Sequence, residues 1–208
     1  MRLSFQFNGF KCPPNMTGHL QKVFDGEYDV PVEGKFRILD LGANCGAFAL
    51  WAFHRWPGSA IQCYEPHPET VRILEKNVAG YPKISIVPRA VGTPGIRPLY
   101  NGPNNCGEAS LHHMTNNPTP TGQHVEVIDP LKLPVADILK MDIEGSELEI
   151  LRPLLADGRS FDAILLEYHN EQIRREVDRL LEDYNLWRIE QANSQRGTVC
   201  YLNKRLAL

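Results

Sequence analysis

Apolar and polar positions follow two patterns along this chain: short apolar runs, and longer stretches with helical spacing. From Phe36 onward, apolar runs bounded by glycine, proline or acidic residues predict buried strands. These strands cover 36–41, 60–65, 83–88, 136–142 and 161–168, with two closing strands at 186–190 and 198–202. Between most of them, apolar residues three or four positions apart predict helices. The alternation predicts an α/β fold, doubly wound around a mostly parallel seven-stranded sheet.

Capping residues indicate where several helices begin. Pro68 fits the first turn of the helix that follows the second strand. Ser146 and Glu149 fit a capping box at the start of the helix whose apolar face carries Leu148, Leu151 and Leu155. Asn170 can cap the last helix through its side-chain oxygen. The two closing strands are close enough in sequence to pair antiparallel.

Two segments interrupt the pattern. Residues 1–34 contain several prolines and glycines and predict an irregular lead-in or lid before a domain that covers 35–208. Residues 92–130 are rich in Gly, Pro and Asn, with strand-like pieces at 97–100, 109–112 and 124–128. A structureless loop of that length is uncommon in a compact domain, so we expect part of it to form added strands.

Composition narrows the class of protein. A chain of 208 residues with 42% hydrophobic residues suits one globular domain. The net charge of -3 gives no electrostatic reason to expect nucleic acid as a partner. No apolar run reaches the length of about 18 residues that spans a membrane, and the N-terminus is too polar for a signal peptide. The five cysteines are odd in number and contain no C-x-x-C, so we expect neither disulfides nor zinc, and a reducing, cytoplasmic setting.

A glycine-rich turn follows the first predicted strand. The segment runs DLGANCG, in which Asp40, Gly42, Ala43, Asn44 and Gly46 lie where the strand gives way to a helix. Glycine allows the sharp turn and lets a ligand approach the backbone, and ligands of open α/β sheets bind at the carboxyl ends of strands. The spacing is D-x-G-x-x-x-G and not the G-x-G-x-x-G of dinucleotide-binding proteins, which disfavours an NAD-dependent oxidoreductase. Asp40 suits the ammonium group of an amino acid better than a phosphate.

An acidic residue ends the second predicted strand. Glu65, followed by Pro66, lies 19 residues after Gly46. An acidic side chain at about this distance accepts hydrogen bonds from the ribose of a ligand held by the first loop. An ordinary strand-end turn explains either signal alone. In this order and in these elements, the two together predict a cofactor that contains a nucleoside.

Further polar residues lie at the ends of later strands. Asp142 and Glu144, two residues apart, are expected to project to one side near the cofactor. His169 follows the next strand and titrates near neutrality, so it could remove a proton from an acceptor. The alternatives are that the carboxylates are solvated residues at a helix entry and that His169 is structural. Glu147, in the first helical turn, is interpreted only as such a helix-entry residue.

The segments ILDLGANCGAFAL, CYEPHPETVRILEKN, VPRAVG, LKMDIEGSELEIL and LLEYH resemble the FkbM family of S-adenosylmethionine-dependent methyltransferases. The resemblance covers about residues 22–202, and its most specific part is DIEGSE. It implies a class I Rossmann-like fold and O-methylation of sugar, polyketide or related hydroxyls. It also implies cofactor-binding positions, with Arg89 and Ala90 beside the adenine; the complete set is Asp40, Gly42, Ala43, Asn44, Gly46, Glu65, Pro66, Arg89, Ala90 and Asp142. The segments 1–34 and 92–130 would then shape the pocket for a small-molecule or glycan acceptor.

The expected reaction is an in-line displacement in which the protein aligns the acceptor oxygen and excludes water. His169 or Glu144 would act as the base, with Asp142 orienting the acceptor or cofactor. We expect no metal, although Asp142, Glu144 and His169 could instead bind a divalent cation. A second alternative is a methyltransferase-like module that binds its ligand without catalysis.

Overall fold

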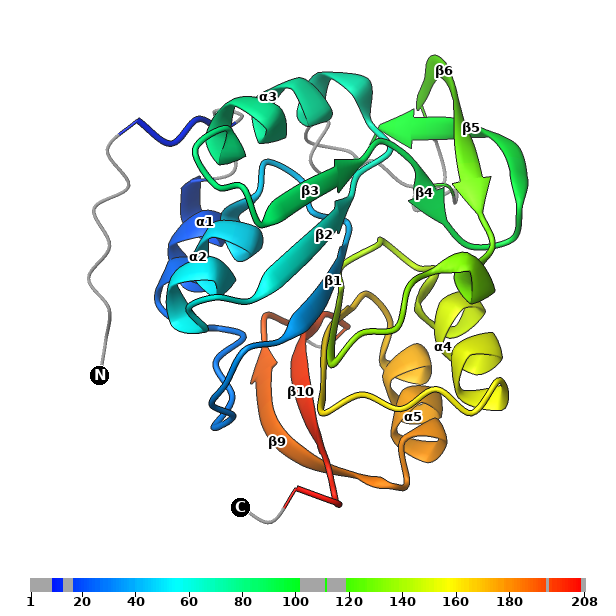
Figure 1. Ribbon diagram of the computed structural model, residues 1–208. Coiled ribbons are helices and arrows are strands. Elements are labelled where there is room, and N and C mark those ends of the chain that lie inside the picture. The colour runs from blue at the N-terminus through cyan, green and yellow to red at the C-terminus, as the bar shows by residue number, and fades with distance from the viewer. Residues whose placement is uncertain (1–8, 13–16, 102–110, 112–118, 194, 207–208) are drawn as a thin grey trace.

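A seven-stranded sheet forms the centre of the protein, seen in a computed structural model that describes residues 9–12, 17–101, 111, 119–193 and 195–206 (Figure 1). Its order is β3-β2-β1-β7-β8-β10-β9. The strands are β1 (Arg37–Leu41), β2 (Ala60–Tyr64), β3 (Ile84–Val87), β7 (Ile138–Met141), β8 (Ala163–Tyr168), β9 (Tyr184–Gln191) and β10 (Gly197–Asn203). β10 is antiparallel to both of its neighbours, and the pairs among β3, β2, β1, β7 and β8 are all parallel. The predicted fold class is confirmed.

Helices cover both faces of this sheet, as Figure 1 shows. The helices are α1 (Thr17–Phe24), α2 (Ala47–Arg55), α3 (Pro68–Val78), α4 (Glu147–Ala156) and α5 (Glu171–Leu180). Buried side chains of α2 and α3 share one hydrophobic cluster, and those of α4 and α5 share another. Successive residues of a strand point to opposite faces, so Ile38 of β1 belongs to the first cluster and Leu39 to the second.

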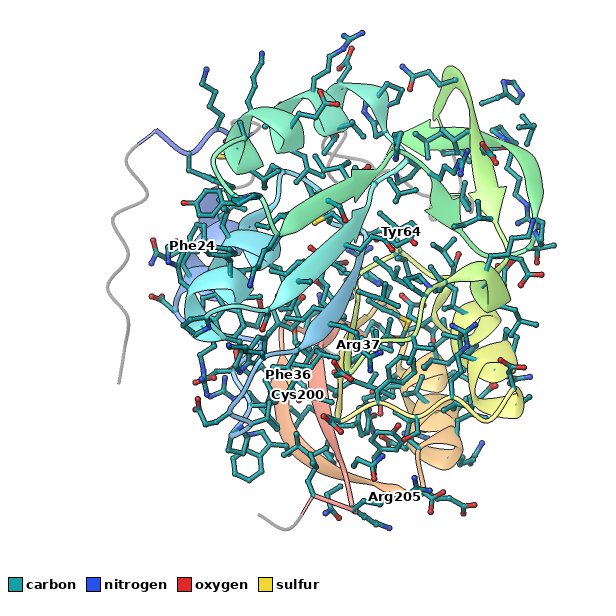
Figure 2. The ribbon with its side chains drawn as sticks, in the orientation of Figure 1. Phe24, Phe36, Arg37, Tyr64, Cys200 and Arg205 are labelled. Carbon is teal, nitrogen blue, oxygen red and sulfur yellow. The ribbon has the colours of Figure 1, made fainter. Side chains whose placement is uncertain are left out.

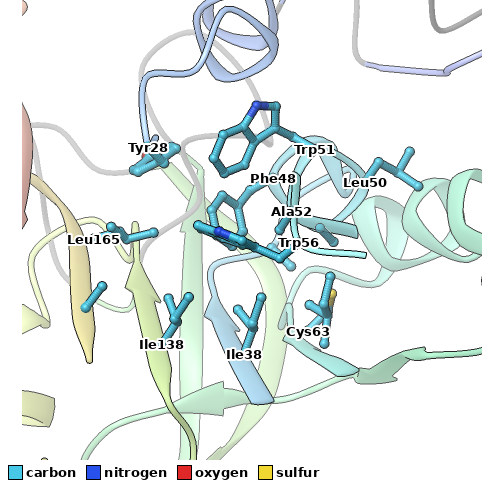
Figure 3. Packing of buried hydrophobic residues seen from close by; sticks show 14 of the residues in the cluster. Tyr28, Ile38, Phe48, Leu50, Trp51, Ala52, Trp56, Cys63, Ile138 and Leu165 are labelled. Atoms are coloured by element: carbon cyan, nitrogen blue, oxygen red, sulfur yellow. The ribbon is translucent and has the colours of Figure 1, made fainter. Parts of the chain in front are cut away.

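Aromatic residues of α2 make the first cluster dense. In Figure 3, Phe48, Ala52 and Trp56 lie over Ile38 and Ile138 of two adjacent strands. Trp56 is fully buried, and its indole N–H donates to a backbone carbonyl of the lead-in at 3.0 Å. Each large side chain buried in this way contributes roughly 1.5–3 kcal/mol, which fixes α2 and the lead-in against the sheet.

The beginnings of the helices test the predicted caps. Pro68 lies in the first turn of α3, and the Asn170 side chain accepts from the backbone N–H of Gln172 at 2.7 Å, both as predicted. The capping box at α4 is wrong, because Ser146 is the N-cap residue but makes no side-chain cap hydrogen bond. Glu149 instead accepts a hydrogen bond from the backbone N–H of Thr93.

The buried face of α4 also differs slightly from the prediction. Ile150, Leu151 and Leu154 are fully buried there, while Leu148 and Leu155 are only partly buried at its margins. The helix is therefore rotated toward the positions adjacent to those expected from spacing alone.

Part of the segment 92–130 forms a second sheet. Its order is β4-β6-β5, with β4 (Ala90–Val91), β5 (Gly95–Asn101) and β6 (Thr119–Ile128). The prediction of added strands is confirmed, and the small sheet lies beside the carboxyl end of β2 in Figure 1. The strand-like piece 109–112 lies outside the described residues except for Leu111. A short 3-10 helix (Pro130–Lys132) then leads back toward β7.

The lead-in contains a helix, α1, where an irregular chain was expected. After α1 the chain contacts the closing strands, because Thr198 donates to the Glu27 carboxylate at 2.7 Å and Arg188 donates to the carbonyl of Gly26 at 2.5 Å. Asp29 pairs with Arg55 of α2 at 2.7 Å. The part of the lead-in after α1 is therefore anchored to both α2 and the sheet. Among the described residues, no helix has the length and apolarity needed to cross a membrane.

Candidate functional site

A cavity lies where the carboxyl ends of β1, β2 and β7 meet the small sheet. Figure 2 labels Tyr64 at this end of β2 and Arg37 at the opposite end of β1. The lining residues are Leu41, Gly42, Asn44, Tyr64, Glu65, Pro66, Arg89, Ala90, Val91, Leu99, Leu111, Asp142, Ile143, Glu144 and Ser146. The cavity thus brings together most of the residues selected from the sequence. Asp40, Ala43, Gly46 and His169 are the exceptions, because they do not line it.

Gly42 allows two loops to touch at the floor of the cavity. Its φ of 75° is in the left-handed region, and a Cβ at this position would lie 1.8 Å from the carbonyl oxygen of Asp142. The backbone N–H groups of Gly42 and Ala43 both donate to the carbonyl of Tyr64 at 3.0 Å. Only glycine permits this contact, and the contact holds the loops after β1, β2 and β7 together.

Glu65 is the buried acid of the cavity. One carboxylate oxygen accepts from the backbone N–H of Asn44 at 2.9 Å, and the other accepts from that of His67 at 2.8 Å. Burial raises the pKa of Glu65 to about 7, although these two hydrogen bonds act in the opposite direction. Each carboxylate oxygen has a second lone pair, so the group can still accept hydrogen bonds from a ligand.

Ala43 and Gly46 support the cavity from behind. Ala43 is buried in the cluster around α2. Gly46 has a φ of 89°, and a Cβ there would lie 2.6 Å from a methyl group of Leu74 in α3. Both residues were selected from the sequence as cofactor-binding, and the structure shows them packing against protein atoms.

Asp40 also lies beneath the cavity and not in its wall. Its carboxylate is fully buried and lies 3.1 Å from the ammonium group of Lys140, which donates to the carbonyl of Gly42 at 2.9 Å. Burial raises the pKa of Asp40, while Lys140 acts in the opposite direction. The sequence suggested that Asp40 would bind an ammonium group of the ligand. In the structure its carboxylate pairs with the ammonium group of Lys140 instead.

Lys140 was not selected from the sequence. It is buried within β7, over the rings of Tyr28 and Phe48 at 6.0 and 5.8 Å from their centroids. Burial by itself would lower the pKa of Lys140, but the charges of Asp40 and Asp142 raise it. A lysine inside an otherwise apolar strand requires a buried counter-ion. The position of Lys140 in the predicted strand 136–142 could therefore have indicated this ion pair from the sequence.

Asp142 and Glu144 also line the cavity. Strand alternation does not place them on one side, because β7 ends at Met141 and Glu144 has a φ of 54°. The left-handed backbone at Glu144, uncommon for a residue with a side chain, turns its carboxylate toward His169. A Glu144 oxygen lies 3.2 Å from His169 Nε2, and an Asp142 oxygen lies 4.0 Å from the same atom.

His169 is held from its other side by Glu147. Its Nδ1 lies 3.2 Å from Glu147 Oε1, which also accepts from the backbone N–H of Gly145 at 3.0 Å. Glu147 is fully buried, so its interpretation as a solvated helix-entry residue is wrong. Burial would lower the pKa of His169, but contacts with Glu144 and Glu147 raise it to about 11. The ring is therefore surrounded by carboxylates.

A third carboxylate faces the same ring nitrogen. Glu167 Oε1 lies 3.8 Å from His169 Nε2. Burial, and then the charge of Asp142, raises the pKa of Glu167 well above its usual range. Three carboxyl groups therefore face one nitrogen of the His169 ring.

The remaining wall is more apolar. Ala90 and Val91 of β4 and Leu99 of β5 line it together with Leu111. Arg89 also lines the cavity, and its guanidinium pairs with Glu126 of β6 at 2.8 Å. The small sheet therefore supplies a surface on which a flat, weakly polar group can lie.

A family model and several known proteins match this chain. The family model described as the methyltransferase FkbM domain matches residues 40–186. Methyltransferase sdnD of Sordaria araneosa is 26% identical over 185 residues, which cover 70% of this chain and 71% of its own length. The hexuronic acid methyltransferase AglP of Haloferax volcanii is 24% identical over 154 residues, covering 72% of this chain and 62% of its own.

A solved structure shows the same fold. The crystal structure of a methyltransferase FkbM from Methylobacillus flagellatus superposes with a TM-score of 0.58 at 13% identity. The match covers 88% of this chain and 47% of that chain. This chain therefore spans less than half of the solved protein and less than two thirds of AglP.

Proposed function

From the premise that this chain belongs to the FkbM methyltransferase family, we propose that it methylates a hydroxyl oxygen of a sugar, polyketide or similar acceptor. The cofactor of the family is S-adenosylmethionine, as the sequence resemblance implied. The observation that supports the proposal best is the composition of one cavity. Glu65 and residues of the small sheet line it together with Asp142 and Glu144.

The residues present fit S-adenosylmethionine. Glu65 is a buried carboxylate with lone pairs left for ribose hydroxyls, and Arg89 and Ala90 line the region proposed for the adenine. Gly42 and Asn44 also line the cavity, so the glycine-rich loop after β1 borders the proposed cofactor site. When bound, the cofactor supplies a methyl group on a sulfonium, with a neutral thioether as the leaving group.

The protein's own task is to position an acceptor and take its proton. Glu144 lines the cavity, whereas the His169 side chain is 1% exposed and does not. We therefore assign the proton to Glu144, which receives it from the hydroxyl as the new carbon–oxygen bond forms. His169, between Glu144 and Glu147, fixes the position of the Glu144 carboxylate. Asp142 orients the acceptor from the adjacent position.

The acceptor class is proposed from a relative and from the cavity wall. AglP is named as a hexuronic acid methyltransferase, so a sugar derivative is the first acceptor to test. We propose that the segments 1–34 and 92–130 form the acceptor side of the pocket. Leu99 and Leu111, from the second of these segments, line the same cavity as the residues proposed for the cofactor, so that segment borders the proposed cofactor site.

A defined panel of acceptors tests the proposal. The protein and S-adenosylmethionine are incubated with hexuronides, neutral glycosides and polyketide alcohols, and S-adenosylhomocysteine formation and product mass are measured. We expect an acceptor that gains one methyl group through an ether, which survives mild alkali. An alkali-labile methyl ester, an N-methyl product, or cofactor binding with no turnover across the panel would contradict the proposal.

A further inference from the structure

We propose that Asp142, Glu144 and His169 bind one divalent cation at the acceptor end of the cavity. The inference rests on the proposed function and deepens it, since the cation would hold the acceptor oxygen. One potential ligand atom from each of the three residues lies within 4.8 Å of the others. Asp142 and Glu144 come from the loop after β7 and His169 from the end of β8, so two neighbouring strands of the sheet fix the cluster.

The histidine is oriented as a metal ligand. Glu147 Oε1 lies 3.2 Å from Nδ1 of His169, and an ionised carboxylate can only accept, so the proton lies on Nδ1. A metal ion at Nε2 would take the place of a second ring proton, on the side of the ring that faces the carboxylates. The side chain is 1% exposed, and Nε2 makes no hydrogen bond of acceptable geometry with any described residue. A histidine that binds a metal through one ring nitrogen usually donates the N–H of the other to a carboxylate or a carbonyl.

The charges around this nitrogen favour a cation independently. Oxygens of Glu144, Glu167 and Asp142 lie 3.2, 3.8 and 4.0 Å from His169 Nε2. The nearby ammonium group of Lys140 is closer to Asp40, at 3.1 Å, than to Asp142, at 4.0 Å. A divalent ion between the carboxylates would offset their mutual repulsion, which otherwise disfavours three anions in a partly buried site.

The ligand types favour a particular ion. Two carboxylates and one imidazole suit Mn²⁺, which accepts oxygen and nitrogen, better than Mg²⁺, which prefers oxygen alone. Three protein ligands leave positions of an octahedral ion open for water or an acceptor oxygen. A hydroxyl bound there loses its proton more easily. Glu144 would bind through one carboxylate oxygen and keep the other for that proton.

Binding of Mn²⁺ alone tests the inference without an acceptor. The full chain, stripped of metal with EDTA and dialysed, is titrated with MnCl₂ while the electron paramagnetic resonance signal of free Mn²⁺ is recorded. We expect one saturable site per chain. Asp142→Asn, Glu144→Gln and Glu147→Gln should each weaken binding by about 10- to 100-fold. Glu182→Gln, which changes an exposed carboxylate just beyond the end of α5, should leave binding unchanged.

A parallel calorimetric titration with S-adenosylhomocysteine separates the two proposals. If that ligand binds but Mn²⁺ shows no saturable site, the metal inference is overturned and the methyltransferase assignment stands. If Mn²⁺ binds equally to the wild-type protein and to the Asp142→Asn and Glu144→Gln variants, the site is elsewhere and the inference is also overturned. Circular dichroism melting of each variant identifies any that fail to fold. The number of Mn²⁺ ions bound per wild-type chain tests the metal inference even if no variant folds.

Discussion

At the scale of single residues, the cavity is defined by ionisable groups that are buried but keep part of their hydrogen-bonding capacity. Glu65 receives two backbone N–H groups and is otherwise shielded from water. Such a carboxylate is costly to ionise until a ligand supplies more donors. If Glu65 binds the ribose as proposed, its protonation and that binding are coupled.

Binding of S-adenosylhomocysteine should depend on pH through Glu65. The pKa of Glu65 is raised to about 7, and ribose hydroxyls donate to the ionised form, so binding releases a proton when the pH is below 7. Affinity should fall as the pH decreases, by about tenfold between pH 8 and pH 6. Calorimetric titration with S-adenosylhomocysteine in buffers from pH 6 to pH 8 measures this change in affinity. Glu65→Gln should bind more weakly with a flat pH profile; a variant that keeps the wild-type slope would contradict this origin.

Glu144 and His169 should affect turnover far more than cofactor affinity. Glu144→Gln removes the proposed base, and we expect the turnover rate to fall by about 10²- to 10⁴-fold. His169→Ala releases the Glu144 carboxylate from its position and should also reduce turnover strongly. Affinity for S-adenosylhomocysteine should stay within about twofold in both variants. Near-normal turnover of both on a true acceptor would show that the assignment is wrong.

At the scale of elements, the site depends on loops that touch each other. The loop after β1 contacts the loop after β7 through Gly42 and Asp142, and it contacts the end of β2 through hydrogen bonds to Tyr64. Lys140 adds a buried ionic link between β7 and β1 through Asp40. Through these contacts, the strands of the sheet fix the positions of Glu65, Asp142 and Glu144 relative to one another.

Gly42→Ala should therefore damage both the fold and the site. The added Cβ would lie 1.8 Å from a backbone oxygen at a φ of 75°, so the loops must separate. We expect a loss of more than about 2 kcal/mol in the free energy of unfolding, measured by urea denaturation. Gly80→Ala is the matched control, because a Cβ there meets nothing within 4 Å. Equal stability of the two variants would contradict the proposed loop contact.

At the scale of the whole molecule, the elements were predictable where local sequence determines them. The five parallel strands of the large sheet lie within apolar runs such as 36–41 and 161–168, because a strand buried on both faces has few polar positions. Helix α1 was missed because prolines and glycines surround it, and its packing against α2 is a tertiary contact.

The site was predictable in its position and less so in its internal contacts. The ends of β1, β2 and β7 could be assigned to one edge because parallel strands share a direction. The burial of Glu147 could not be predicted from the sequence, because a glutamate in a first helical turn usually faces water. It is buried because His169, from the end of another strand, packs against it. The pairing of Asp40 with Lys140 likewise depends on the register of β1 against β7.

The crystal structure of the protein bound to S-adenosylhomocysteine is the most direct test of the account. We expect the ribose hydroxyls at the Glu65 carboxylate, the adenine beside Arg89 and Ala90, and the sulfur facing Asp142 and Glu144. Ligand density at any other surface of the molecule, or a bound ribose that makes no contact with Glu65, would contradict the account.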